Sequence, residues 1–163
     1  MKKLILSFVL VAGFAHAGFK LPTSAFKSSE IAEAEAKAKS TSKPITFLIS
    51  DIDSTCPLCD SASETILKEL KVKTVVVYAR KRDDIPEKAR ALLAGKDTGR
   101  FIPYAVVMDS GYEKVLGIVQ YETIKKEGPK AFREVEAAIR DMKKPIGGGS
   151  GSSLDAFIPK PQP

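Results

Sequence analysis

Two cysteines, Cys56 and Cys59, are the residues whose type and spacing most directly suggest chemistry. They are the only cysteines among the 163 residues of the chain. An apolar run over residues 45–49 precedes them, and a helical pattern extends from Pro57 to about Leu70. A strand that ends at a Cys-x-x-Cys motif from which a helix begins is the arrangement of a dithiol redox site.

The expected position of Cys56 at the start of a helix would make its thiol reactive. Unpaired backbone N–H groups and the helix dipole favour a thiolate there. Cys59 follows one helical turn later on the same face, where it can form a disulfide with Cys56. The next residue is Asp60, and its carboxylate should partly oppose thiolate formation at Cys56.

The N-terminal segment 1–17 has the pattern of a secretory signal peptide. A basic start is followed by the apolar stretch 4–14 and by a small-x-small cleavage site, Ala15-His16-Ala17. The apolar stretch is too short to span a membrane. We therefore expect a mature chain without a membrane span that is exported, most simply to a bacterial periplasm. Secretion from the cell and a buried N-terminal helix are the alternatives.

Export affects how the cysteines are interpreted. Thiols in an oxidising compartment usually become oxidised unless a reductant maintains them. A disulfide that closes so short a loop stabilises a fold very little, because the stabilisation grows with loop length. The spacing of Cys56 and Cys59 therefore favours redox chemistry over a structural disulfide, with a vestigial local disulfide as the alternative.

The overall charge favours a solvated mixed surface over a nucleic-acid interface. The net charge is +6, but Lys2 and Lys3 would leave with the signal peptide. The mature chain would then have 24 of the 26 basic residues against 20 acidic ones, a net charge of +4 spread along the sequence. We expect no nucleic-acid partner from so mild an excess.

Several classes of chemistry are excluded by composition. The only histidine, His16, would be removed with the signal peptide, so Cys-His and Ser-His-Asp catalysis are ruled out. Two cysteines alone make an incomplete zinc site, because structural zinc takes four ligands. No phosphate-binding glycine motif occurs in a strand-to-helix context. We therefore expect no metal and no separate cofactor, the redox centre being the Cys56–Cys59 disulfide itself.

The pattern of helices and strands predicts one domain over residues 28–143. An extended lead-in, 18–27, precedes it, and a Gly/Ser linker with a Pro-rich tail, 144–163, follows it; the tail is either disordered or a short docking segment. Within the domain the sequence predicts, in order, a helix from residue 28, a strand over 44–50, a helix over 57–70, a strand over 73–78, a short helix over 86–95, a strand ending at 109, a strand over 114–121 and a helix that begins at Gly128.

This order resembles the thioredoxin fold, and the likeness covers the whole domain. Two motifs carry it: Cys56-Pro57-Leu58-Cys59 and, about forty residues later at the start of a strand, Ile102-Pro103. The resemblance implies an α/β three-layer fold with a central mixed sheet of about four strands flanked by helices. It also implies that Pro103 is the cis-proline that faces the dithiol and that Ile102 offers its backbone to an extended substrate.

The resemblance further implies an exported thiol–disulfide oxidoreductase that exchanges disulfides with protein substrates and a redox partner protein. The alternative is a non-catalytic thioredoxin-like binding module. The direction of electron flow stays open, as does the oligomeric state. One departure concerns the buried acid that thioredoxins have before the motif, because Ser50 stands at about that spacing; Asp51 and Asp53 are expected to be loop and capping residues.

Overall fold

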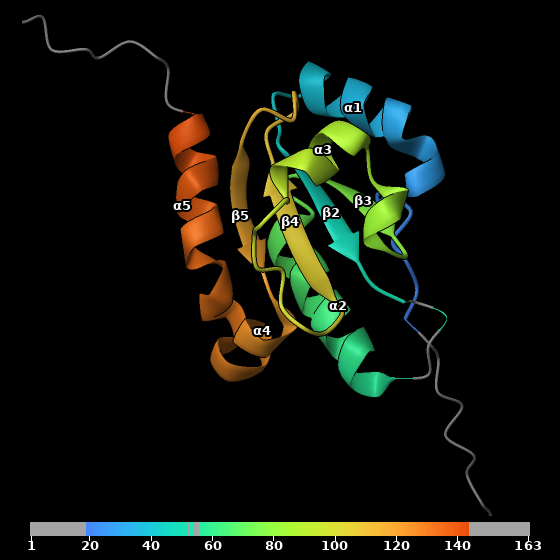
Figure 1. Ribbon diagram of the computed structural model, residues 1–163, viewed down its shortest axis with the longest axis vertical. Helices are drawn as coiled ribbons and strands as arrows, with labels where there is room; N and C mark the ends of the chain where they lie inside the picture. Colours follow the sequence, from blue (N-terminus) through green and yellow to red (C-terminus); the bar gives the residue numbers. More distant parts are fainter. Residues whose placement is uncertain (1–18, 52, 54–55, 144–163) are drawn as a thin grey trace, which may run out of the picture.

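The centre of the computed structural model, which describes residues 19–51, 53 and 56–143, is a mixed sheet (Figure 1). Its strands are β1 (Phe26–Lys27), β2 (Ile45–Ile49), β3 (Val75–Ala79), β4 (Tyr104–Met108) and β5 (Val115–Val119). Their spatial order is β1, β3, β2, β4, β5. The first three strands run parallel, whereas β4 is antiparallel to β2 and β5 is antiparallel to β4.

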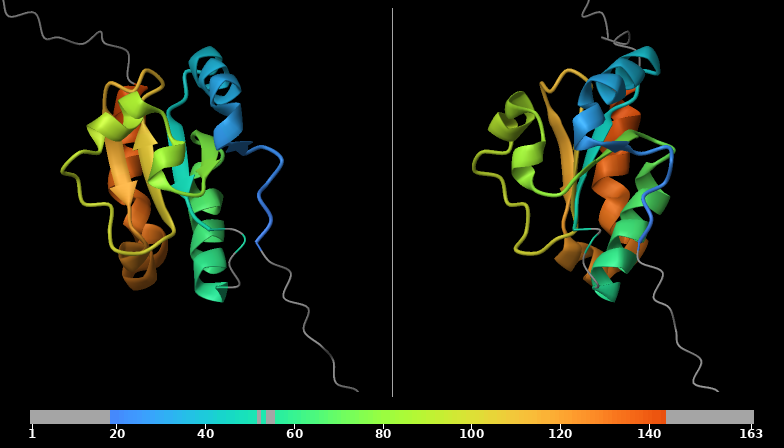
Figure 2. Two further views of the ribbon diagram at one scale, coloured as in Figure 1. Left: turned by 45° about the vertical axis from the view of Figure 1, so that its right-hand side comes forward. Right: turned by 90° about the vertical axis from the view of Figure 1, so that its right-hand side faces the viewer.

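Helices cover both faces of this sheet, which gives the molecule three layers (Figure 2). One face is covered by α1 (Ile31–Ser40) and α3 (Glu87–Leu92); the other is covered by α2 (Pro57–Leu70), α4 (Tyr121–Glu127) and α5 (Arg133–Met142). Short 3₁₀ segments, η1 (Ser28–Glu30), η2 (Arg82–Asp84) and η3 (Gly128–Phe132), precede α1, α3 and α5.

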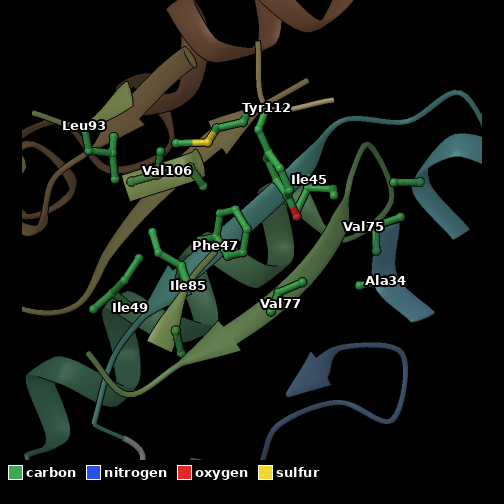
Figure 3. Close-up of a cluster of buried hydrophobic side chains, with 14 of the residues drawn as sticks. Ala34, Ile45, Phe47, Ile49, Val75, Val77, Ile85, Leu93, Val106 and Tyr112 are labelled. Carbon is green, nitrogen blue, oxygen red and sulfur yellow. The ribbon is translucent and has the colours of Figure 1, made fainter. Parts of the chain in front are cut away.

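The alternation of side chains along β2 builds a core on each face. Ile45, Phe47 and Ile49 point to the α1 and α3 side, where Phe47 lies at the centre of the cluster in Figure 3. Leu48 points to the opposite side and packs in the cluster that α2 and α5 cover. Because successive side chains of a strand point to opposite faces, burial of both sets fixes how β2 sits in the sheet.

The predicted α/β, thioredoxin-like architecture is confirmed, with one more strand than expected. The additional strand is β1, which lies within the segment 18–27 that was expected to be only an extended lead-in. Phe26 and Lys27 pair in parallel with Val77 and Tyr78 of β3. Two residues are too few to produce a periodic pattern, so the strand is recognisable only from its partner.

A second difference lies between β5 and the last helix. The prediction extended the strand to Tyr121 and began the last helix at Gly128, but residues 121–127 form α4 and the last helix starts at Arg133. Gly128 ends α4 with a positive φ of 57°, a conformation that favours glycine. An acid near the start of this segment, bases at its end and a following glycine were signals of a helix that the sequence did contain.

Some predicted regions cannot be compared with this structure. The proposed signal peptide, 1–17, and the linker and tail, 144–163, lie outside the described residues. Within the described part of the chain, no helix is both long enough and apolar enough to cross a membrane.

Candidate dithiol site

The pairing of β2 with β4 brings the two predicted motifs together. The strands are antiparallel, and Ile49 at the end of β2 lies opposite Tyr104 at the start of β4. The end of β2 and the start of β4, which Pro103 directly precedes, therefore lie side by side at one end of the sheet. The peptide bond between Ile102 and Pro103 is cis, so this part of the prediction is confirmed.

Cys56 is the N-cap residue of α2, and Pro57 occupies the first helical position. An early proline is tolerated because the N–H it lacks would have no partner within the helix. The backbone N–H of Cys59 donates to Cys56 Sγ at 3.4 Å, and the Cys59 thiol donates to the same sulfur at 2.8 Å. Both cysteines are free thiols. One sulfur at the helix start therefore collects the hydrogen bonds that stabilise a thiolate.

These hydrogen bonds lower the pKa of the Cys56 thiol below its ordinary value. The largest cause is the bond from the Cys59 side chain, and the backbone N–H of Cys59 comes second. Burial opposes them, and the carboxylate charge of Asp60 opposes them least. The opposition expected from Asp60 is therefore present but does not decide the direction.

The same geometry has the opposite effect on Cys59. Burial, followed by its hydrogen bond to Cys56, raises the pKa of the Cys59 thiol to about 11. The charges of Cys56, Asp60 and Asp51 add to this rise. At neutral pH the pair therefore consists of a thiolate-prone outer sulfur and a protonated inner one, as nucleophile and resolving thiol require.

Cys59 also contacts the loop that precedes β4. Its Sγ lies 3.7 Å from the backbone carbonyl oxygen of Ile102. The sequence placed this loop against Cys56, whereas the contact found is with Cys59, whose sulfur touches that of Cys56. The backbone of Ile102 therefore lies next to the dithiol. Its predicted role of binding a substrate chain stays a prediction.

Ser50, at about the sequence spacing of the buried acid of thioredoxins, pairs with a second buried serine. Ser50 at the end of β2 and Ser63 on α2 are both buried, and their hydroxyl groups lie 2.9 Å apart. Asp51 and Asp53 lie beside the site instead, within 3.6 Å and 3.7 Å of the Arg80 guanidinium. The hydroxyl pair satisfies two buried polar groups without placing a charge beneath the sulfurs.

The residues where β5 gives way to α4 anchor the loop that carries Ile102. The Glu122 Oε1 atom accepts from the backbone N–H of Arg100 at 3.1 Å, and the Gln120 side-chain amide donates to the carbonyl oxygen of Asp97 at 3.1 Å. Gly99 fits this anchor for two reasons. Its φ of 83° favours glycine, and an added Cβ would lie 2.8 Å from Glu122 Oε2.

Exposed apolar side chains lie next to the cysteines. Leu58, Phe101 and Ile102 are 62%, 58% and 37% exposed, and they are three of the five large exposed apolar side chains among the described residues. Leu58 lies between the cysteines in sequence, and Ile102 touches Cys59. The ring of Phe101 packs edge-on against Tyr121, with centroids 6.3 Å apart. An apolar surface next to a reactive thiolate is typical of a protein-binding site.

Comparison with known proteins does not assign a family. No protein-family model matches the chain, and no curated protein matches it. The geometry of the site is therefore the basis for a functional proposal.

The structure brings all four predicted site residues together: Cys56, Cys59, Ile102 and Pro103. The anchors Gln120 and Glu122 were not predicted from the sequence. Gln120 fell within the predicted strand over 114–121, and Glu122 fell in no predicted element. In the described residues, no group of three or more His, Cys, Asp or Glu side chains is arranged to hold a metal ion.

The unequal pKa values of the two thiols predict unequal alkylation. At pH 8 iodoacetamide should modify Cys56 at least about tenfold faster than Cys59, because only the thiolate reacts. The Cys56 rate should fall as pH drops through a midpoint below that of an ordinary cysteine. Peptide mass spectrometry of the reduced protein measures both rates.

A matched pair of variants tests the cause. Cys59→Ala removes the side-chain donor to Cys56 Sγ and should shift the Cys56 midpoint upward, whereas Cys59→Ser keeps a side-chain donor and should shift it less. Equal midpoints for both thiols in the unmodified protein would contradict the electrostatic account.

The hydrogen bond between Glu122 and the Arg100 N–H predicts that loss of the Glu122 carboxylate destabilises the protein. Glu122→Ala should lower the free energy of unfolding by about 1–3 kcal/mol, since a hydrogen bond to a charged acceptor is lost. Glu122→Gln retains an oxygen for the Arg100 N–H and should lose less. Urea denaturation measures the stability, and amide exchange at Arg100 reports the contact directly. Unchanged exchange in Glu122→Ala would show that the anchor does not hold the loop.

Proposed function

We propose that this chain is an exported thioredoxin-like thiol–disulfide oxidoreductase that acts on polypeptide thiols and disulfides and exchanges electrons with a redox partner protein. The observation that carries the proposal is the paired geometry of Cys56 and Cys59. Their sulfurs lie 2.8 Å apart at the start of α2, with the pKa of the first thiol lowered and that of the second raised. The export part rests on the signal-like pattern of residues 1–17.

In the reducing direction, the Cys56 thiolate attacks one sulfur of a substrate disulfide. A bond forms between Cys56 and that sulfur, and the other substrate sulfur leaves as a thiolate. The Cys59 thiol then attacks the sulfur of Cys56 and breaks the mixed disulfide. Its proton passes to the departing substrate thiolate, and the Cys56–Cys59 disulfide remains. Two electrons move from the dithiol to the substrate, and the same steps in reverse oxidise a substrate dithiol.

The position of the second thiol supports this sequence of steps. Burial affects the Cys59 thiol more than the Cys56 thiol, so Cys56 is the sulfur that meets the substrate first. The resolving step is intramolecular, and the Cys59 sulfur already lies 2.8 Å from the Cys56 sulfur that it attacks. We therefore expect this step to be fast. The raised pKa of Cys59 keeps it protonated and unreactive until Cys56 carries a substrate.

Trapping of mixed disulfides tests this function. Reduced Cys59→Ser should accumulate covalent complexes with disulfide-bonded test proteins such as insulin, because Cys56 attacks the substrate disulfide but no second thiol resolves the mixed disulfide. Cys56→Ser should form none, and both variants should lose insulin reduction and thiol oxidation. Non-reducing gels with mass spectrometry identify the linked residue. Absence of complexes with Cys59→Ser and of activity in the unmodified protein would favour a non-catalytic binding module.

A further inference from the structure

A groove opens between α2 and α4 beside the dithiol, with a volume of about 280 Å³. Buried side chains of Ala62 and Ile124 line its interior, and Leu58 and Tyr121 line it nearer the sulfurs. Both helices lie on the same side of the sheet, and α4 lies beside α2 in all three ribbon views (Figures 1 and 2). This concave apolar surface, the α2–α4 groove, takes no part in the exchange chemistry described above.

The groove is continuous with the dithiol site at two points. Leu58 lines the groove and is also one of the two residues between the cysteines. Tyr121 lines the groove and packs against Phe101, the neighbour of Ile102. A chain that lies across the carbonyl of Ile102 with its sulfur at Cys56 therefore has the groove directly beside it.

The size of the groove favours a side chain over a complete small ligand. Pockets that enclose a whole ligand usually have volumes of roughly 300–1,000 Å³, so this groove is at their lower limit. It suits one large apolar side chain, and full burial of such a side chain strengthens binding roughly ten- to a hundredfold. That contribution is enough to select among substrates.

The charged side chains on the rim of the groove that form no ion pair are positive. Lys68 and Lys125 line the groove, are exposed, and form no ion pair within the described part of the chain. The acid beside them, Glu69, lies 3.8 Å from Lys73, which also donates to Glu136 at 2.5 Å. A segment with a carboxylate next to its apolar residue would therefore meet unpaired cations, whereas a basic segment would be repelled.

We propose that the α2–α4 groove binds an extended segment of the polypeptide substrate, holding one large apolar side chain near the reacting cysteine and preferring acidic neighbours. This inference rests on the proposed function. It names the substrate class as acidic, apolar-containing polypeptide segments rather than small disulfides.

Activated peptides test the proposal on the Cys59→Ser variant of the otherwise complete protein. Each peptide has one cysteine as a mixed disulfide with thionitrobenzoate, in a Gly/Ser background through which one Leu with an adjacent Asp is moved. Attack by Cys56 links the peptide and expels coloured thionitrobenzoate, so absorbance gives the rate. At least one Leu position should react about tenfold faster than the plain Gly/Ser peptide.

Two matched pairs of variants locate the effect. Ser61→Trp fills the groove and should abolish the acceleration, whereas Glu64→Trp, on the same helix but outside the groove, should keep it within about twofold. Lys125→Glu should slow the Leu–Asp peptide several-fold more than Lys126→Glu, which has the same net charge but does not line the groove. A small uncharged disulfide, dithiodipyridine, should react equally with all four variants.

Each result has a distinct meaning. Reaction with the small disulfide but no acceleration at any Leu position, or equal loss in Ser61→Trp and Glu64→Trp, would overturn the groove proposal and leave the proposed function standing. Acceleration that emerges only after removal of residues 144–163 would assign the groove to the chain's own tail and would also overturn it. Failure of every variant to react with either reagent would overturn the proposed function and this inference with it.

Discussion

The antiparallel register of β2 and β4 is the constraint on which the site depends. It sets Ile49 opposite Tyr104, and the helix that starts at Cys56 and the cis Ile102–Pro103 bond meet as a result. A slip of one residue would exchange the faces of every side chain in the strand. Because both faces of β2 are buried in separate apolar clusters, such a slip would expose one core to water and bury the wrong side chains in the other. The two apolar cores therefore fix the position of Cys56 relative to the Ile102–Pro103 bond.

Burial and a close approach of two sulfurs together make the thiols unequal. The hydrogen bond that Cys59 donates lowers the pKa of Cys56, whereas burial, followed by that same hydrogen bond, raises the pKa of Cys59. The fold supplies this asymmetry through the helix start at Cys56 and the partial burial of Cys59. Asp60 works against the thiolate but has the smallest influence on Cys56, so a residue that looked unfavourable in sequence has little effect in three dimensions.

Features with local determinants were predictable from the residues. Pro57 after a cysteine and the apolar run before it act within a few residues, so α2 was predictable. The cis bond at Pro103 was implied by the resemblance to thioredoxins rather than by local sequence. Features whose determinants are distant in sequence were missed. β1 exists only through its partner β3, and the contact of Glu122 with Arg100 joins residues 22 positions apart. The groove is a product of two helices, and no pattern within either one reveals it.

The reduction potential of the Cys56–Cys59 pair tests the central claim most directly. Equilibration of the protein with glutathione buffers of increasing oxidised fraction, followed by quenching and mass analysis, gives the fraction of intramolecular disulfide at each potential. The account predicts one two-electron transition between about −120 and −270 mV, the range of proteins that exchange disulfides with substrates. A transition below about −300 mV, as in structural disulfides, or no intramolecular disulfide at any potential, would contradict it.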